Sequence, residues 1–190
     1  MELLLSANLF ISETRLIVEY KPKRNSYSYG FIDIFMSDFA TGNSVVIELK
    51  LFNIVGLFNG ARALGTYEIY PHHDKLEVLD KELNLEPEES LFKRNYMYWS
   101  KDDKKYISVT VSDHINHGIE QLNRYINTLS SGNANIPNKK IGILDNRIII
   151  EEGRSYLKGI LISSFGSQRV LVKETSIMKI DYQYYIKQLV

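Results

Sequence analysis

The sequence predicts an α/β protein made of one domain, residues 1–190, in which a mixed central β-sheet of about four to five strands is flanked by helices. Two segments rich in β-branched and aromatic residues, 29–36 and 45–51, surround a turn and predict a β-hairpin. A long amphipathic segment, 116–129, predicts a helix that packs on the sheet. The 190 residues suffice for one sizeable core, since a domain of this size buries roughly 70% of its unfolded surface.

The composition limits the possible functions. The 23 basic and 23 acidic residues cancel, so any nucleic-acid contact has to come from local basic patches. The absence of cysteine excludes disulfides and thiolate metal sites, and it fits a reducing compartment. The N-terminal segment MELLLSANLF has no basic residue ahead of its leucines, and no apolar run approaches the ~20 residues of a membrane helix. We therefore expect an intracellular protein that does not span a membrane.

The first half of the chain predicts a short helix followed by the strands of the hairpin. Pro22 ends the first strand, and the Gly42-Asn43 pair supplies turn chemistry between the second and third strands. Glycines within the next apolar stretch predict a broken helix. The expected elements are a helix at 2–10, strands at 14–20, 29–36 and 45–51, and a helical stretch at 52–70.

The second half begins with an acidic stretch that predicts helix in pieces, and strand patterns follow. Ser112 and Asp113 are good N-caps for the long helix. The C-terminal segment predicts a closing helix. The expected elements are helical pieces within 71–105, strands at 106–111, 141–144, 147–151, 157–163 and 169–173, and helices at 116–129 and 180–190.

The hairpin carries acidic side chains on both of its strands. Because side chains alternate between the two faces of a strand, Asp33 shares a face with Phe35, and Glu48 shares a face with Lys50. A turn centred near residues 40–41 places Asp33 opposite Glu48, with Cβ atoms roughly 4.5–5.5 Å apart. A divalent cation neutralises two such carboxylates, and Mg²⁺ prefers one or two carboxylates together with water and substrate phosphate. The pattern therefore predicts a Mg²⁺ or Mn²⁺ site.

Two further groups on the second strand fit phosphodiester chemistry. Lys50 would orient or deprotonate the attacking water and offset phosphate charge, and the main-chain carbonyl of Leu49 would add a metal ligand. The competing interpretation is an exposed hairpin with a cross-strand ion pair between a glutamate and a lysine, which would contribute little stability.

The predicted helix at 116–129 places two polar side chains beside its apolar stripe. Gln121 and Tyr125 are four residues apart and lie on one face, and His114 falls on the same flank. An amide and a phenol at the edge of a buried face can reach a phosphate or a metal-bound water. The alternative is a pair of boundary residues that satisfy each other's hydrogen bonds.

Taken together, Gly30-x-x-Asp33, Glu48-x-Lys50 and Gln121-Leu122-x-x-Tyr125 resemble the motifs of the PD-(D/E)XK nuclease superfamily. The closest match is its RecB-like branch, in which a Q-x-x-x-Y helix completes the site. The sequence is also similar to nuclease-like modules found next to AAA-ATPase-like domains, where Ser28-Tyr29-Gly30 would be the approach to the aspartate. The resemblance covers residues 1–173 or so.

The resemblance implies a restriction-endonuclease-like fold and a metal-dependent nuclease that acts on nucleic acid, with DNA as the expected substrate. It implies that Asp33 and Glu48 are metal ligands, that Lys50 is the catalytic lysine, and that Gln121 and Tyr125 support them. It also implies an ATPase or another protein as a partner. In the first helix, Glu2 is the one candidate for the additional acid of the family.

Two other interpretations stay open, namely a catalytically inactive nuclease-like module that binds a protein or nucleic acid, and a purely structural α/β domain. Lys21, Lys23 and Arg24, with neighbouring tyrosines, form a candidate nucleic-acid contact. The glycine spacing of residues 60–65 lacks the lysine of a phosphate-binding loop, so nucleotide hydrolysis is not predicted. The pair His72-His73 predicts a solvated loop rather than a metal site.

Overall fold

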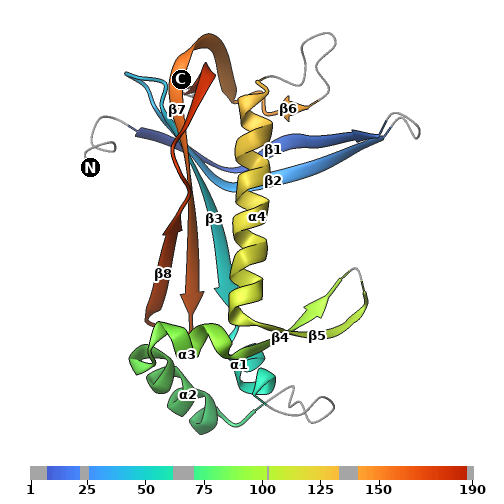
Figure 1. Ribbon diagram of the computed structural model, residues 1–190, viewed down its shortest axis with the longest axis vertical. Coiled ribbons are helices and arrows are strands. Elements are labelled where there is room, and N and C mark those ends of the chain that lie inside the picture. Colours follow the sequence, from blue (N-terminus) through green and yellow to red (C-terminus); the bar gives the residue numbers. More distant parts are fainter. Residues whose placement is uncertain (1–7, 22–25, 62–70, 102, 133–140, 188–190) are drawn as a thin grey trace. The chain divides into compact units, whose positions relative to one another are not determined.

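The computed structural model describes residues 8–21, 26–61, 71–101, 103–132 and 141–187 (Figure 1). Its strands are β1 Asn8–Lys21, β2 Ser26–Asp38, β3 Ser44–Phe52, β4 Asn95–Ser100, β5 Lys105–Thr110, β6 Gly142–Ile143, β7 Ile148–Phe165, β8 Arg169–Glu174 and β9 Met178–Ile186. Its helices are α1 Ile54–Gly60, α2 His73–Leu85, α3 Glu88–Lys93 and α4 Val111–Ser130. None of these helices combines the length and apolar character needed to cross a membrane.

The protein is of the α/β type, as predicted, but its main sheet has seven strands in place of the four or five expected. The strand order is β6-β1-β2-β3-β7-β8, and β9 pairs with β7. A separate two-stranded sheet consists of β4 and β5. The β1–β2, β2–β3, β1–β6, β4–β5 and β7–β9 pairs are all antiparallel.

The chain divides into two compact units. Unit 1 comprises Met1–Glu48, Ile119–Leu161 and Lys173–Val190, and unit 2 comprises Leu49–Gly118 and Ile162–Val172. Each unit is therefore assembled from segments that lie far apart in the sequence.

Several expected elements differ from the structure. The two strands expected at 147–151 and 157–163 form one continuous strand, β7. The segment predicted as a C-terminal helix forms strand β9, because Ile180, Tyr184 and Ile186 follow the two-residue period of a strand with one buried face. Residues 8–10 belong to β1 instead of a helix, and the rest of that predicted helix lies outside the described residues. Strand β4 arises inside the stretch expected to be helical.

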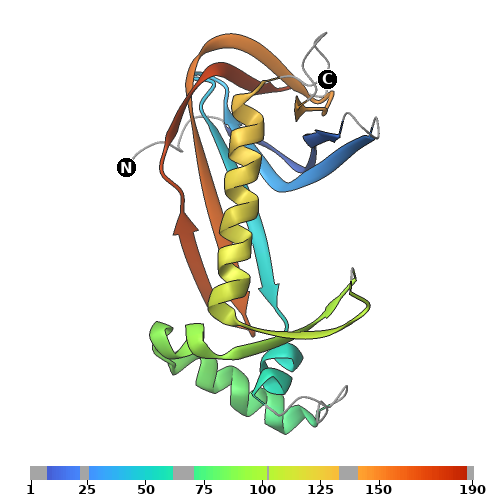
Figure 2. The same cartoon turned by 45° about the vertical axis from the view of Figure 1, so that its right-hand side comes forward.

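The core of unit 1 lies between the sheet and the C-terminal half of α4 (Figure 2). The side chains of Leu122 and Ile126 lie directly over Gly159 of β7. At the end of the helix, the Tyr184 hydroxyl donates a hydrogen bond to the main-chain oxygen of Leu129. The apolar stripe predicted from the sequence is thus the face that α4 turns toward the sheet.

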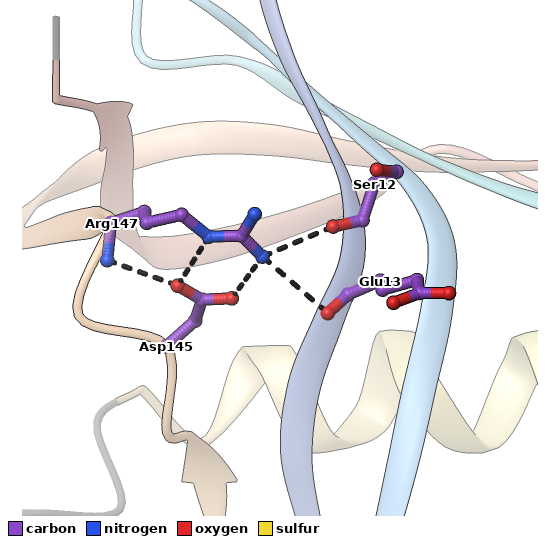
Figure 3. Close-up of polar contacts among 4 residues, drawn as sticks. All are labelled: Ser12, Glu13, Asp145 and Arg147. Carbon is purple, nitrogen blue, oxygen red and sulfur yellow. Dashed lines mark hydrogen bonds and ion pairs between the residues drawn. The ribbon is translucent and has the colours of Figure 1, made fainter. Parts of the chain in front are cut away.

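An ion pair between Arg147 and Asp145, called the clasp below, connects the start of β7 to β1 within unit 1. Figure 3 shows the Arg147 guanidinium paired with the Asp145 carboxylate through two hydrogen bonds, of 2.9 and 2.7 Å. The same guanidinium donates to the main-chain oxygens of Ser12 and Glu13, at 3.0 and 3.4 Å. Glu13 has a φ of 54°, a left-handed conformation that is uncommon for residues other than glycine. The clasp therefore holds β1 at a point where its backbone is irregular.

In unit 2, the short helix α1 packs closely on β4. A Cβ at Gly56 would overlap the main-chain oxygen of Met97, so the helix can approach the strand only because residue 56 has no side chain. Asn53 caps α1 by accepting a hydrogen bond from the Val55 amide at 2.9 Å. Helix α2 is joined to β8 through Arg169, whose guanidinium donates to the main-chain oxygen of Leu83 at 2.5 Å.

Candidate functional site

The predicted hairpin of β2 and β3 is present, and its paired residues end one position before the expected pair of acids. Strands β2 and β3 pair antiparallel from Ser37↔Ser44 to Ile34↔Ile47. Continuing this register by one residue places Asp33 across from Glu48. Glu48 is only 2% exposed, whereas Asp33 is half-buried. Burying a carboxylate is costly unless positive charge or hydrogen bonds compensate it. The hairpin therefore carries one acid on each strand near the end of its paired region, one of them deep in the protein.

Asp33 lies where β2 changes the face that it buries. Before it, Gly30 and Ile32 are buried, and after it Phe35 and Ser37 are buried. The buried positions thus move from even to odd numbers, and Asp33 stands at the change. A strand that kept a regular alternation could not bury both sets of side chains on one face.

The neighbouring strand is irregular at the same level. Thr14 pairs with Ile32 and Ser12 pairs with Ile34, so Glu13, with its positive φ, is opposite Asp33. The register is unchanged on either side of this pair, so the irregularity is the left-handed conformation of Glu13, a kind of backbone outlier that clusters at functional sites. The clasp of Arg147 with Asp145 fixes the Glu13 main chain, and it therefore helps to set the backbone around Asp33.

Lys50 and Leu49 follow Glu48 along β3. The burial pattern of the strand alternates, with Val46 and Glu48 buried and Leu49 exposed. Lys50 is half-buried and shares the face of Glu48, as the sequence predicts.

Gln121 and Tyr125 contact each other on α4. The Gln121 side-chain nitrogen donates a hydrogen bond of 2.8 Å to the Tyr125 hydroxyl. Tyr125 is 6% exposed, so it lies deeper than a position at the edge of the apolar stripe. Its ring packs on Gly30 of β2, where a Cβ would lie 2.6 Å from Tyr125 Cε1. The structure therefore brings this pair to the strand that carries Asp33, at a point three residues before it.

His114 occupies an aromatic cluster in unit 2. Its ring centroid lies 5.1 Å from that of Phe52, 5.2 Å from that of Tyr96 and 5.1 Å from that of Tyr98. Its buried Nδ1 atom has no hydrogen-bond partner. Burial lowers the pKa of His114, and the positive charges of Lys50 and His117 lower it further. Sequence reasoning placed His114 on the flank of Gln121, and it missed the aromatic surroundings because their residues come from separate segments.

The remaining candidates are less organised. His72 lies on the surface, 3.3 Å from the Asp74 carboxylate. Of the predicted basic run, Lys21 pairs with Glu19 at 3.3 Å, while Lys23 and Arg24 lie outside the described residues. Glu2, the candidate for an additional acid, also lies outside them.

Within the described ranges, no group of three or more His, Asp and Glu side chains is placed to hold a metal ion. Asp33 and Glu48 are therefore the two side chains on which a metal site in this hairpin would depend. No protein-family model, curated protein or solved structure matches this chain. The nuclease resemblance consequently stays a prediction from the motifs.

Proposed function

We propose that the protein is a metal-dependent nuclease that hydrolyses phosphodiester bonds, with DNA as the expected substrate. The proposal depends chiefly on the hairpin. One step beyond the last β2–β3 pair, Ile34↔Ile47, the same register would bring Asp33 opposite the buried Glu48, which supports the proposal. Two neighbouring carboxylates demand positive charge, and oxygen ligands of this kind suit Mg²⁺ or Mn²⁺. The purely structural interpretation does not explain why an acid occupies a core position of β3.

Each residue of the proposed site has a distinct task. Asp33 and Glu48 would hold the metal ion, with the Leu49 carbonyl as a further oxygen ligand. When bound, the metal would acidify a water molecule and polarise the scissile phosphate. Lys50, on the same strand face as Glu48, would position the attacking water and offset charge on the phosphate. Gln121 would orient the Tyr125 hydroxyl through their hydrogen bond, and Tyr125 would act as a positioning residue.

The test combines metal binding with cleavage. Titration calorimetry with Mn²⁺ should detect binding to the wild-type protein and not to Glu48→Gln. Glu151→Gln is the matched control, because Glu151 is an exposed acid on β7. In a cleavage assay with Mg²⁺ or Mn²⁺ on single- and double-stranded substrates, Lys50→Ala should lose activity and Glu151→Gln should keep it. Mn²⁺ binding that is absent, or that is unchanged in Glu48→Gln, contradicts the proposal.

A second candidate function is that of an inactive nuclease-like module that binds nucleic acid or another protein, such as an ATPase. The lack of a third acidic or histidine ligand among the described residues favours it. The neutral net charge also fits an interaction module. Calorimetry separates the two functions, since an interaction module would hold its partner without Mn²⁺. Both functions would operate inside the cell.

A further inference from the structure

A pocket of about 400 Å³ lies in unit 2 between α1 and the β4–β5 hairpin. This volume falls within the range of about 300–1,000 Å³ that is typical of small-molecule sites. Its wall combines four aromatic rings with two side-chain amides. These residues are Asn53, Asn59, Tyr96, Tyr98, Trp99 and Tyr106. All of them belong to unit 2, and none is part of the proposed metal site.

The two outer rings are exposed to solvent on the hairpin. Trp99 pairs across the strands with Tyr106, and their ring centroids lie 5.2 Å apart in an edge-to-face arrangement. Trp99 is 52% exposed and Tyr106 is 40% exposed. The two rings are inclined at 76° to each other, so they do not form one flat surface, and each offers its own exposed apolar surface to a ligand. Rings of this kind stack on nucleobases whatever their sequence, which strengthens the binding of single strands.

The inner wall consists of rings that pack on one another. Tyr96 and Tyr98 lie nearly parallel, with centroids 5.9 Å apart and an interplanar angle of 17°. Tyr96 is packed against Phe52 as well, at 4.9 Å. Because their neighbours hold these rings, the pocket keeps its shape without a ligand, which lowers the entropy cost of binding.

The amides supply the polar groups that a planar heterocycle requires. Asn53 is fixed in place, because its side-chain oxygen caps α1 through the Val55 amide. Asn59 lines the same pocket from α1 and is buried. Because the cap uses the oxygen of Asn53, this side chain would contact a nucleobase through its NH2 group, which can donate to an acceptor on the base edge.

The turn of the hairpin, residues 101–105, carries three lysines and two aspartates and therefore a net charge of +1. Lys101, Lys104 and Lys105 are all exposed there. Asp103 is folded into the turn, where its carboxylate accepts a hydrogen bond of 2.8 Å from the Ser100 hydroxyl. Lysines next to a stacking platform suit a polyanionic backbone, because they attract phosphates without reading the sequence.

We propose that this pocket binds an unstacked base of a single-stranded nucleic acid, with Trp99 and Tyr106 as the stacking platform and the lysines of the turn on the phosphates. The proposal deepens the proposed function, on which the choice of a nucleic-acid ligand rests. It gives that function a substrate form, a single strand or a locally opened end, because the bases of an intact duplex are stacked on each other and cannot enter the pocket.

The chain contains one tryptophan, so its fluorescence reports on this pocket alone. We would titrate the wild-type protein with a short oligothymidylate in EDTA, where metal-dependent cleavage cannot occur. Trp99 emission should be quenched as the strand binds. An abasic oligomer of equal length and a duplex are the comparison ligands, and both should bind at least about tenfold more weakly.

Substitutions of the platform residues Trp99 and Tyr106 test whether the strand binds there. Tyr106→Ala should weaken binding of the labelled oligothymidylate, measured by anisotropy, by about tenfold or more. Trp99→Leu should do the same and gives a second test if Tyr106→Ala does not fold. Tyr156→Ala is the matched control, because Tyr156 is an exposed tyrosine on β7 in unit 1, and it should bind like the wild type.

Equal affinity for the abasic oligomer, equal affinity for the duplex, or unchanged binding in both platform variants would each overturn the proposal. The cleavage assay keeps this failure separate from that of the proposed function. Cleavage without quenching of Trp99 would reject the pocket and keep the nuclease. Quenching by the oligothymidylate without cleavage would keep the pocket and reject the nuclease.

Discussion

The ring of Tyr125 rests on Gly30 so closely that a Cβ at residue 30 would lie 2.6 Å from Tyr125 Cε1. The same Cβ would lie 2.9 Å from Val18 Cγ1. Residue 30 is therefore glycine because α4 approaches β2 at this point, and not because of an unusual backbone conformation. This contact sets the position of Tyr125, and of the Gln121 that is bonded to it, relative to the strand of Asp33.

We expect Gly30→Ala to destabilise the protein by about 1–3 kcal/mol, because the added methyl group overpacks a site formed by a buried ring and a strand. Urea denaturation followed by circular dichroism measures the change. Gly153→Ala is the control, since the nearest atoms there belong to the flexible side chain of Gln183. Its effect should stay within about 0.5 kcal/mol. Equal losses in the two variants would contradict the proposed packing.

Tyr125→Phe separates the ring from the hydroxyl. The ring on Gly30 remains, so stability should fall by only about 0.5–1.5 kcal/mol, the usual net contribution of one hydrogen bond. If Tyr125 is a positioning residue in a nuclease, kcat should fall while the Mn²⁺ affinity is kept. A parallel loss of metal affinity would instead indicate that the hydroxyl acts in metal binding.

The clasp should make the free energy of unfolding depend on pH in the acidic range. Hydrogen bonding to Arg147 holds the pKa of Asp145 below its ordinary value of about 3.9. The folded state thus retains the carboxylate at pH values where the unfolded chain takes up a proton. This stabilisation is present above about pH 4 and is lost as the pH falls through the pKa of the folded state.

At pH 7, Asp145→Asn should lower the free energy of unfolding by about 1–3 kcal/mol, and the difference from the wild type should shrink toward pH 3. Urea midpoints across this range measure it. Glu77→Gln removes the exposed ion pair with Lys81 and should cost less at pH 7, because water screens that pair. A pH-independent difference for Asp145→Asn would contradict the clasp.

His114 should cause a second loss of stability on acidification, at a higher pH than the loss that is due to Asp145. Burial, with Lys50 and His117, lowers the pKa of His114 below the ordinary value of about 6.5. As the pH falls below that value, the unfolded chain binds a proton that the folded protein resists, so stability decreases until the pKa of the folded state is reached. His114→Phe keeps an aromatic ring among Phe52, Tyr96 and Tyr98, and it should flatten the stability profile below pH 6.5. An imidazole titration by NMR with a midpoint at or above 6.5 would contradict this prediction.

Metal binding should appear as stabilisation, because a ligand that binds only the folded state raises its free energy of unfolding. At a Mn²⁺ concentration 100 times its Kd, the gain is about 2.7 kcal/mol. Thermal melts with and without Mn²⁺ should show this gain for the wild type and for Glu151→Gln, and no gain for Glu48→Gln or Asp33→Asn. Equal shifts in all four proteins would place the metal elsewhere.

The hairpin shows how far a local pattern predicts structure. The alternation of residues 45–51 and the turn before them gave the faces and the register from which Asp33 and Glu48 were paired. Both depend on the two-residue period and on the turn, which are local. The change of buried face at Asp33 was not predicted, and the left-handed Glu13 opposite it belongs to another strand, so the local pattern of β2 does not contain it.

The wrong secondary-structure predictions concern segments whose composition fits both a helix and a strand. The C-terminal segment contains enough tyrosine and isoleucine for either a helix or a strand, and pairing with β7 selects the strand. Residues 95–100 are a run of large aromatic and apolar residues without clear alternation, and they directly follow the acidic helical segment α3, so the sequence predicts them as part of it. The aromatic pocket was also missed. It forms only where α1 lies next to β4, and these two elements are far apart in the sequence.

Strand β3, helix α4 and strand β7 each run through both compact units, so neither unit corresponds to a single stretch of the gene. Any truncation that removes one unit also removes part of a strand or helix that continues into the other unit. A protein truncated in this way is therefore expected to be unfolded, whichever unit is removed. Point substitutions, like those above, are the appropriate way to attribute an activity to one region of this protein.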